Sequence, residues 1–270
     1  VPEERLGLMM GIASLITAMA PAVGPSLGGL IVSNWGWRMI FVALLPLLLL
    51  SLLFGAFSIR QVTETQKATF QTGEYLLLVL GFACLIFATS LASGSGWTSA
   101  PVLLLFLASL LALALFCRCS LRAQTPLINL RVFRRGPFTF SVLVLVLIQF
   151  VCLGLGFLIP NYAQIVSRQE AFLAGCLLLP GCLVGAVLSP VSGRVLDRLG
   201  PERPILLGNL SILVSLVCFS LFAGALTTGA FLVFYLFFAF GQGFSVGTSM
   251  TNGLSHLPPE QNPDGNAVIN

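Results

Sequence analysis

The chain has 270 residues, of which 57% are hydrophobic and only 8% are charged, and its mean hydropathy is +1.01. Soluble domains carry roughly 25% charged residues, so this composition excludes a water-soluble globular protein, which needs polar groups to cover its surface. The formal net charge of +4 comes from basic residues scattered among short connectors, and this argues against a nucleic-acid-binding protein.

Eight apolar segments follow one another along the chain, each bounded by charges or by Gly, Pro, Asn and Ser. About 20 apolar residues cross the hydrocarbon layer as a helix, and lipid leaves other backbone forms without hydrogen-bond partners. The alternation typical of barrel strands is missing. The sequence therefore predicts an all-α, polytopic membrane protein, a helical bundle with spans at about 7–33, 39–58, 75–93, 101–117, 138–159, 171–190, 204–224 and 229–251.

The first segment contains Ala18-Met19-Ala20, which is similar to a signal-peptide cleavage site. The residues before it are net acidic and the apolar run continues beyond it, so we expect a retained span. Because the chain opens on a charged segment without Met and stops at Asn270 as a new helix begins, we expect the interior of a longer protein.

The basic residues predict the orientation. Eight spans place both ends on one side, and the connectors on that side hold eleven of the 13 Lys and Arg, whereas the other side holds Arg38 and Arg168. Short connectors rich in Lys and Arg stay in the cytoplasm. We expect a multi-pass protein of the cell membrane with both ends of the segment cytoplasmic; the basic residues on that side are Arg5, Arg60, Lys67, Arg118, Arg122, Arg131, Arg134, Arg135, Arg194, Arg198 and Arg203.

No acidic residue falls in the middle of a span, where a carboxylate is the usual proton or cation site. If the protein is coupled to protons, we expect the coupling carboxylates outside this segment. Clusters of His, Asp or Glu, rings of charge and filter loops are also missing from the spans, so neither an enzyme nor a channel is expected. Seven cysteines and a single histidine favour small buried thiols over a zinc site, and no metal is expected.

The first span carries a ridge of small residues, Ala20, Gly24 and Gly28, spaced by four. Small ridges let membrane helices approach closely, and prolines beside them loosen the helix. The ridge is similar to the antiporter motif of the fifth helix in the major facilitator superfamily, and it departs from that pattern only at Ala20, where the family has Gly. The resemblance implies a conformational hinge made of Gly11, Ala20, Gly24, Pro25, Gly28 and Gly29; a tightly packed bundle helix is the alternative.

Residues 193–205 resemble the superfamily's cytoplasmic loop motif, although Pro201 and Glu202 stand where the family prefers basic residues. The resemblance implies that Asp197 anchors a neighbouring helix end and holds one transport state. We expect its carboxylate at a helix N-terminus, where the helix dipole stabilises it; an ordinary charged turn is the alternative. The gating residues implied by the resemblance are Gly193, Asp197, Arg198, Gly200 and Arg203.

Five apolar segments separate the two motifs, whereas three helices separate them in twelve-span members of the superfamily. The chain therefore resembles the fourteen-span drug:proton antiporters, which carry an added helix pair. Residues 35–41 and 126–135 also resemble stretches of that class. The resemblance implies the end of the N-terminal six-helix half at 1–58 (helices 5–6), an inserted central helix pair with its loops at 59–125, and the C-terminal half at 126–270 (helices 9–12 and the start of the next).

The resemblance implies secondary active, proton-driven antiport that exports drugs or other amphipathic, often cationic compounds. It implies a small-molecule substrate, protons and membrane lipid as partners, no nucleic acid, a monomer, and no cofactor beyond the proton gradient. Two alternatives stay open. The same fold could export a metabolite, siderophore or amino acid, or the chain could belong to a non-transporting receptor or assembly subunit.

Superfamily transporters bind substrate near the bilayer midplane between two halves. Uncharged polar residues in the later spans are therefore candidates for the substrate path, although each could instead make an interhelical hydrogen bond worth about 0.6 kcal/mol. Glycines within these spans, among them Gly154, Gly156, Gly181, Gly185, Gly241 and Gly243, are expected to be packing or bending points. The substrate-path candidates are Gln149, Asn161, Tyr162, Asn209 and Gln242.

Overall fold

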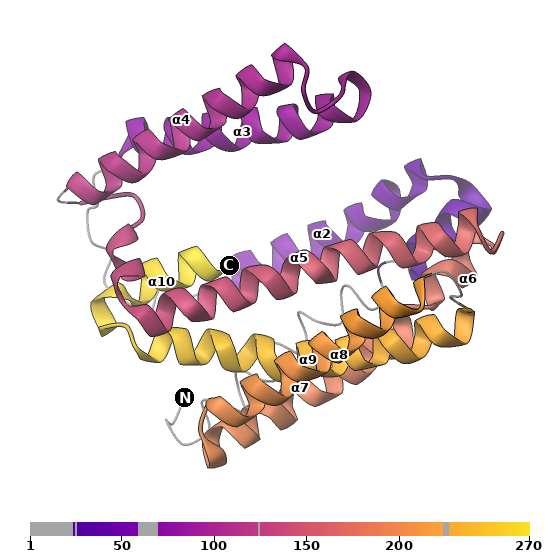
Figure 1. Cartoon of the computed structure of the whole chain (residues 1–270). Coiled ribbons are helices and arrows are strands. Elements are labelled where there is room, and N and C mark those ends of the chain that lie inside the picture. Colours follow the sequence, from indigo (N-terminus) through magenta and orange to yellow (C-terminus); the bar gives the residue numbers. More distant parts are fainter. Residues whose placement is uncertain (1–23, 25, 59–69, 124, 224–226) are drawn as a thin grey trace. The chain divides into compact units, whose positions relative to one another are not determined.

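The computed structural model describes every residue except 1–23, 25, 59–69, 124 and 224–226 (Figure 1). In that part of the chain all regular elements are helices, and seven candidate spans are long and apolar enough to cross a membrane, which confirms the all-α, polytopic fold. The long helices are α2 (Arg38–Ser58), α3 (Thr72–Ser95), α4 (Ala100–Arg122), α5 (Gly136–Ile165), α7 (Leu179–Leu199), α8 (Glu202–Leu221) and α9 (Thr228–Ser255); the short ones are η2 (Leu130–Arg134), α6 (Ala171–Cys176), η4 (Pro259–Gln261) and α10 (Asn262–Ile269).

Seven of the eight expected spans correspond to helices of the structure. Most of the first, 7–33, lies outside the described residues, and its described part from residue 26 onward is helical. The span expected at 171–190 differs most. Its helix is interrupted between α6 and α7, and α7 then continues nine residues beyond the expected end. Hydropathy marks only the part of a helix that lipid solvates, so it does not register a polar extension of the same helix.

The chain forms two compact units. The first comprises Val1–Arg60 and Phe140–Ser255, and the second comprises Gln61–Thr139 and His256–Asn270. In the first unit, α9 packs against both α7 and α8. The helix α2 in the same unit buries no residue, although its sequence is almost entirely apolar. That pattern is typical of a helix solvated by lipid or by another part of the protein.

Glycines set the close approach of α9 to its two neighbours. A methyl group on Gly241 would lie 2.4 Å from the carbonyl oxygen of Gly208 in α8, and one on Gly243 would lie 2.5 Å from that of Gly185 in α7. Helices in lipid gain most of their packing energy from such close contacts. The expectation that span glycines are packing points is confirmed for these positions, whereas Gly154 has no described atom within 4 Å of an added methyl group.

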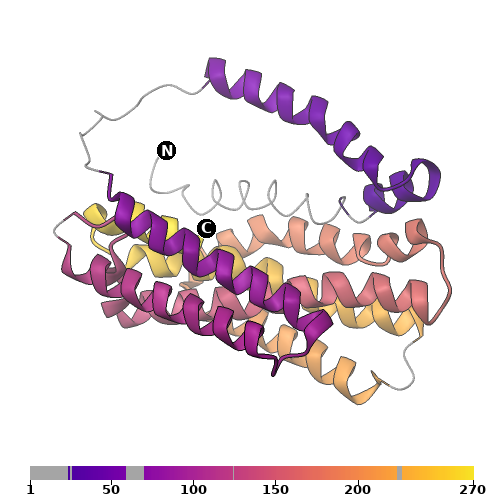
Figure 2. The ribbon, with the colours of Figure 1, turned by 90° about the horizontal axis from the view of Figure 1, so that it is seen from above.

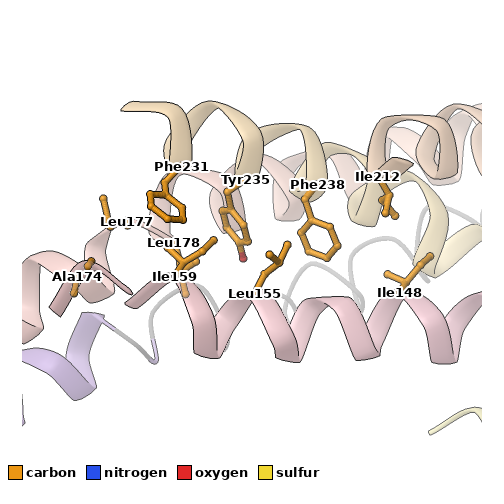
Figure 3. Close-up of a cluster of buried hydrophobic side chains, with 11 residues drawn as sticks. Ile148, Leu155, Ile159, Ala174, Leu177, Leu178, Ile212, Phe231, Tyr235 and Phe238 are labelled. Carbon is orange, nitrogen blue, oxygen red and sulfur yellow. The ribbon is translucent and has the colours of Figure 1, made fainter. Parts of the chain in front are cut away.

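Apolar side chains from α5, α6, α8 and α9, and from the turn between α6 and α7, meet in one buried cluster (Figure 3). Phe231, Tyr235 and Phe238 project from α9 toward Leu155 and its neighbours on α5. The hydroxyl of Tyr235 enters this apolar layer, and the side chain is only 3% exposed. A polar group buried in this way needs a hydrogen-bond partner, and its partner comes from the site described below.

In the second unit, α3 and α4 form an antiparallel hairpin that packs on itself (Figure 2). Gly81 lets the two helices touch, since an added methyl group would lie 2.6 Å from the side chain of Leu113. The hydroxyl of Ser109 donates a 2.8 Å hydrogen bond to the carbonyl of Gly81. Gly81 therefore gives α4 room to approach α3 and also accepts a hydrogen bond from it.

The segment after α4 is held by two carboxylates of the second unit. Glu74 in the first turn of α3 accepts a 2.8 Å hydrogen bond from the backbone N–H of Leu127, and Asp264 of α10 accepts one of 3.2 Å from that of Asn129. Glu74 is only 6% exposed. The buried Glu74 carboxylate is therefore hydrogen-bonded to the segment that follows α4.

Candidate functional site

Four polar or polarisable side chains meet between α5, α7 and α9. The amide Nε2 of Gln242 donates to the sulfur of Cys152 over 3.2 Å. The sulfur of Cys182 lies 3.3 Å from the hydroxyl oxygen of Tyr235, and either group can donate the hydrogen. We call these four residues the thiol–amide patch. Tyr235 is buried, whereas Gln242 and both cysteines are half-buried.

The α-helix places the two stronger hydrogen-bonding groups on one face of α9. Tyr235 and Gln242 are seven residues apart, which is two helical turns, or roughly 10 Å along the axis. The Tyr235 ring packs directly on Gly181 of α7, because a methyl group added to Gly181 would lie 2.4 Å from it. The ring also stacks on Phe238, with ring centroids 5.8 Å apart. These contacts hold the Tyr235 ring in place.

The other substrate-path candidates do not join this patch. Asn209 accepts a 3.1 Å hydrogen bond from Ser245, which ties α8 to α9. Asn161 donates to the carbonyl of Phe157 in its own helix over 2.7 Å, while Gln149 is exposed. The ring of Tyr162 packs on Phe231 with centroids 5.0 Å apart. Of the five candidates, only Gln242 lies in the patch, and a role in substrate binding stays a prediction for all five.

Three residues of the patch were not among the sequence candidates: Cys152, Cys182 and Tyr235. Cysteine inside an apolar run is indistinguishable from a small hydrophobe, and tyrosine from a large one, until its partner is known. The spacing of Tyr235 and Gln242 by two helical turns was the feature of the sequence that could have pointed to Tyr235.

The hinge motif is only partly described. Gly11, Ala20 and Pro25 lie outside the described residues. A methyl group on Gly24 or Gly28 would meet no described atom within 4 Å, whereas one on Gly29 would lie 2.6 Å from the carbonyl oxygen of Ala171. Gly29 is therefore a contact within this chain, and the hinge role of the whole motif stays a prediction.

The loop motif lies at the end of α7 and in the turn that follows. Gly193 is buried within α7, and Asp197 and Arg198 are exposed in its last turn. Gly200 ends the helix with a φ of +78°, a conformation that favours glycine, and its N–H donates to the carbonyl of Leu196. Arg203 is exposed in the first turn of α8.

Asp197 does not lie at the N-terminus of its own helix, and its anchoring of a neighbouring helix end stays a prediction. Asp197 lies near the C-terminal end of α7, where the helix dipole disfavours a carboxylate, and the acidic residue in the first turn of α8 is Glu202. The motif starts inside the helix, and the turn comes only at Gly200. The gating role of Gly193, Asp197, Arg198, Gly200 and Arg203 stays a prediction.

Comparison with known sequences places these features in a family. The whole chain, residues 1–270, matches the profile of the Major Facilitator Superfamily. The chain belongs to that superfamily. It is thus part of a multi-pass membrane protein of a transporter family, and the resemblance drawn from its motifs is confirmed.

Several superfamily relatives are named for drug resistance. The lincomycin resistance protein LmrB of Listeria monocytogenes is 36% identical over 270 residues, which are 100% of this chain and 57% of that protein. The tetracenomycin C resistance and export protein of Streptomyces glaucescens is 32% identical over 216 residues, 80% of this chain and 40% of that protein. The multidrug resistance protein Stp of Mycobacterium tuberculosis is 27% identical over 208 residues, 77% of this chain and 39% of that protein. The chain thus spans 57% of the length of LmrB.

Proposed function

We propose that the protein containing this chain is a secondary active transporter that exports drugs or other amphipathic small molecules from the cell. The observation that carries the proposal is the match of the entire chain to lincomycin resistance proteins, supported by relatives named for multidrug resistance and for tetracenomycin C export. The seven candidate spans among the described residues also support a polytopic carrier.

Exchange for protons is the energy source in this proposal. Drug and proton then favour opposite-facing states, because a ligand shifts a conformational equilibrium only through its different affinities for the two states. The acidic residues of the described helices lie at helix ends, as Glu74, Asp197 and Glu202 do. The carboxylates that exchange the proton therefore belong to another part of the protein. The Lys and Arg residues of the connectors support a cytoplasmic location for both ends of this segment, and superfamily membership supports a location in the cell membrane.

Expression of the complete gene in drug-sensitive bacterial cells tests the proposal. We expect a higher minimal inhibitory concentration of lincomycin than in cells with the empty vector, and dye efflux that stops when an uncoupler collapses the proton gradient. Resistance equal to that of the vector, with the protein present in the membrane, would contradict export. Efflux that continues after uncoupling would contradict proton exchange but not export.

The loop motif gives a separate prediction. In the full-length protein, Asp197→Asn is expected to lower turnover at least roughly tenfold while the protein level changes little. The reason is that the proposed gating role gives the Asp197 carboxylate a hydrogen bond in one transport state, and a hydrogen bond to a charged group is worth about 1.5–3 kcal/mol. The measurement is the initial rate of efflux per unit of membrane protein. Glu202→Gln, which neutralises an exposed carboxylate across the same turn, is the matched control and should stay near wild type. Equal rates for wild type and Asp197→Asn would remove the gating role.

A further inference from the structure

The hydrogen bonds of the thiol–amide patch pair strong groups with weak ones. A glutamine amide and a tyrosine hydroxyl are good donors and acceptors, whereas a cysteine sulfur is a weak acceptor and its S–H a weak donor. Gln242 nevertheless donates to Cys152, and Tyr235 is paired with Cys182, at 3.2 and 3.3 Å. Both bonds lie beside a buried apolar cluster, where a poorly satisfied polar group is costly.

Polar side chains that join α8 to α9 have strong partners. Ser211 and Ser215 of α8 donate to the backbone carbonyls of Phe237 and Phe234 in α9, at 2.7 and 2.6 Å. The hydroxyl of Ser245 donates to the amide oxygen of Asn209. These bonds hold helices together and leave little to be gained by a ligand. The patch differs, because a ligand oxygen would replace a sulfur as the partner of Gln242 or Tyr235.

We propose that Gln242 and Tyr235 form a subsite that binds neutral hydrogen-bonding groups, carbonyls and hydroxyls, of the exported compound. This inference rests on the proposed export function. In the unliganded state Cys152 and Cys182 are the partners of these two groups. A bound carbonyl accepts from the Gln242 amide, and a bound hydroxyl or carbonyl takes the Tyr235 hydroxyl as partner. The roughly 10 Å between the two positions along α9 suits a small molecule with polar groups at two points.

The charge distribution around the patch favours a neutral ligand. Neither α5 nor α9 contains a charged residue. In α7 the first charged residue is Arg194, twelve residues after Cys182 and thus roughly 18 Å further along the helix. A cation at the patch would have no counter-ion from these three helices, and a buried unpaired charge is costly. The subsite therefore selects by hydrogen bonding and apolar contact.

Transport by the full-length protein in liposomes tests this inference with two probes. Chloramphenicol is neutral and carries amide and hydroxyl groups, whereas tetraphenylphosphonium is a hydrocarbon cation without hydrogen-bonding groups. For Tyr235→Phe and for Gln242→Leu, we expect the half-saturating concentration of chloramphenicol to rise about fivefold, the usual effect of one lost hydrogen bond. The half-saturating concentration of tetraphenylphosphonium for the same variants should change less than about twofold, because this cation makes no hydrogen bond to either residue. A change of about twofold is the effect of the weakest hydrogen bonds. Tyr235→Phe keeps the ring that packs on Gly181.

Ser211→Ala is the matched control, because it removes an interhelical hydroxyl outside the patch. It should leave the half-saturating concentrations of both probes at the wild-type value. Equal losses for the two probes, no loss of chloramphenicol transport, or transport of tetraphenylphosphonium alone by the wild type would each overturn the subsite while export stands. Transport of neither probe by the wild type would instead contradict the export function and the subsite with it.

Discussion

Gly241→Ala is expected to destabilise the full-length protein, because the added methyl group would meet backbone atoms that cannot move aside alone. It would lie 2.4 Å from the carbonyl oxygen of Gly208 and 3.0 Å from the backbone nitrogen of Ile212. Overpacking of this kind costs about 1–3 kcal/mol, and more when backbone must shift. Alanine gains about 1 kcal/mol over glycine in helix propensity, which does not offset a separation of α8 from α9.

The measurement is the temperature at which the purified full-length protein in detergent loses half of its monodisperse peak. Gly154→Ala is the matched control, since it makes the same change within a span at a position with no described atom within 4 Å. We expect Gly241→Ala to lose several degrees and Gly154→Ala to stay at or slightly above wild type. Equal stability of the two variants would show that the α8–α9 contact is not as close as described.

Gly24→Leu is expected to abolish transport while the protein still inserts and folds. Gly24 is exposed, and an added methyl group there has no described atom within 4 Å, so the first carbon of the new side chain disturbs no described contact. If the ridge of Gly24 and Gly28 is a hinge surface on which another helix moves, four extra carbon atoms there block the close approach that small residues permit. This variant should therefore lose transport activity but keep its stability.

Ser33→Leu provides the control for this substitution. Ser33 is exposed further along the same helix. Among the described residues, its hydroxyl bonds to the carbonyl of Leu30 in that helix and to the neighbouring Asn34 side chain. We expect Gly24→Leu to reach wild-type amounts in the membrane without measurable efflux, and Ser33→Leu to retain efflux. Wild-type efflux by Gly24→Leu would remove the hinge interpretation, and loss of the protein itself would assign Gly24 to packing.

The helical spans could be predicted from the sequence because an apolar segment in lipid can satisfy its backbone hydrogen bonds within itself only as a helix. The interruption between α6 and α7 could not, since residues 171–190 are apolar on both sides of it. The position of Asp197 inside α7 could not be predicted, for a related reason. The sequence motif marks Gly193 through Arg203 as one unit, whereas the backbone turns only at Gly200, where the positive φ is required.

The site was predictable only in part. Gln242 stands out because a glutamine in an apolar span is costly unless it has a partner or a function. That its partner is a cysteine, and that Tyr235 makes the same kind of pair one heptad earlier, depends on how α5 and α7 are rotated against α9. The burial of Glu74 was likewise not visible, because its partner is the backbone of Leu127, 53 residues away in the chain.

Transport by the purified full-length protein in liposomes, with an imposed pH gradient, tests the proposed function most directly. Lincomycin is added outside liposomes whose interior is acidic, so that proton exit can drive drug entry. Drug exchange for protons predicts accumulation above the outside concentration, its loss when an ionophore collapses the gradient, and its abolition in Gly24→Leu. Equal lincomycin in liposomes with and without the pH gradient would contradict proton-driven drug export by this protein.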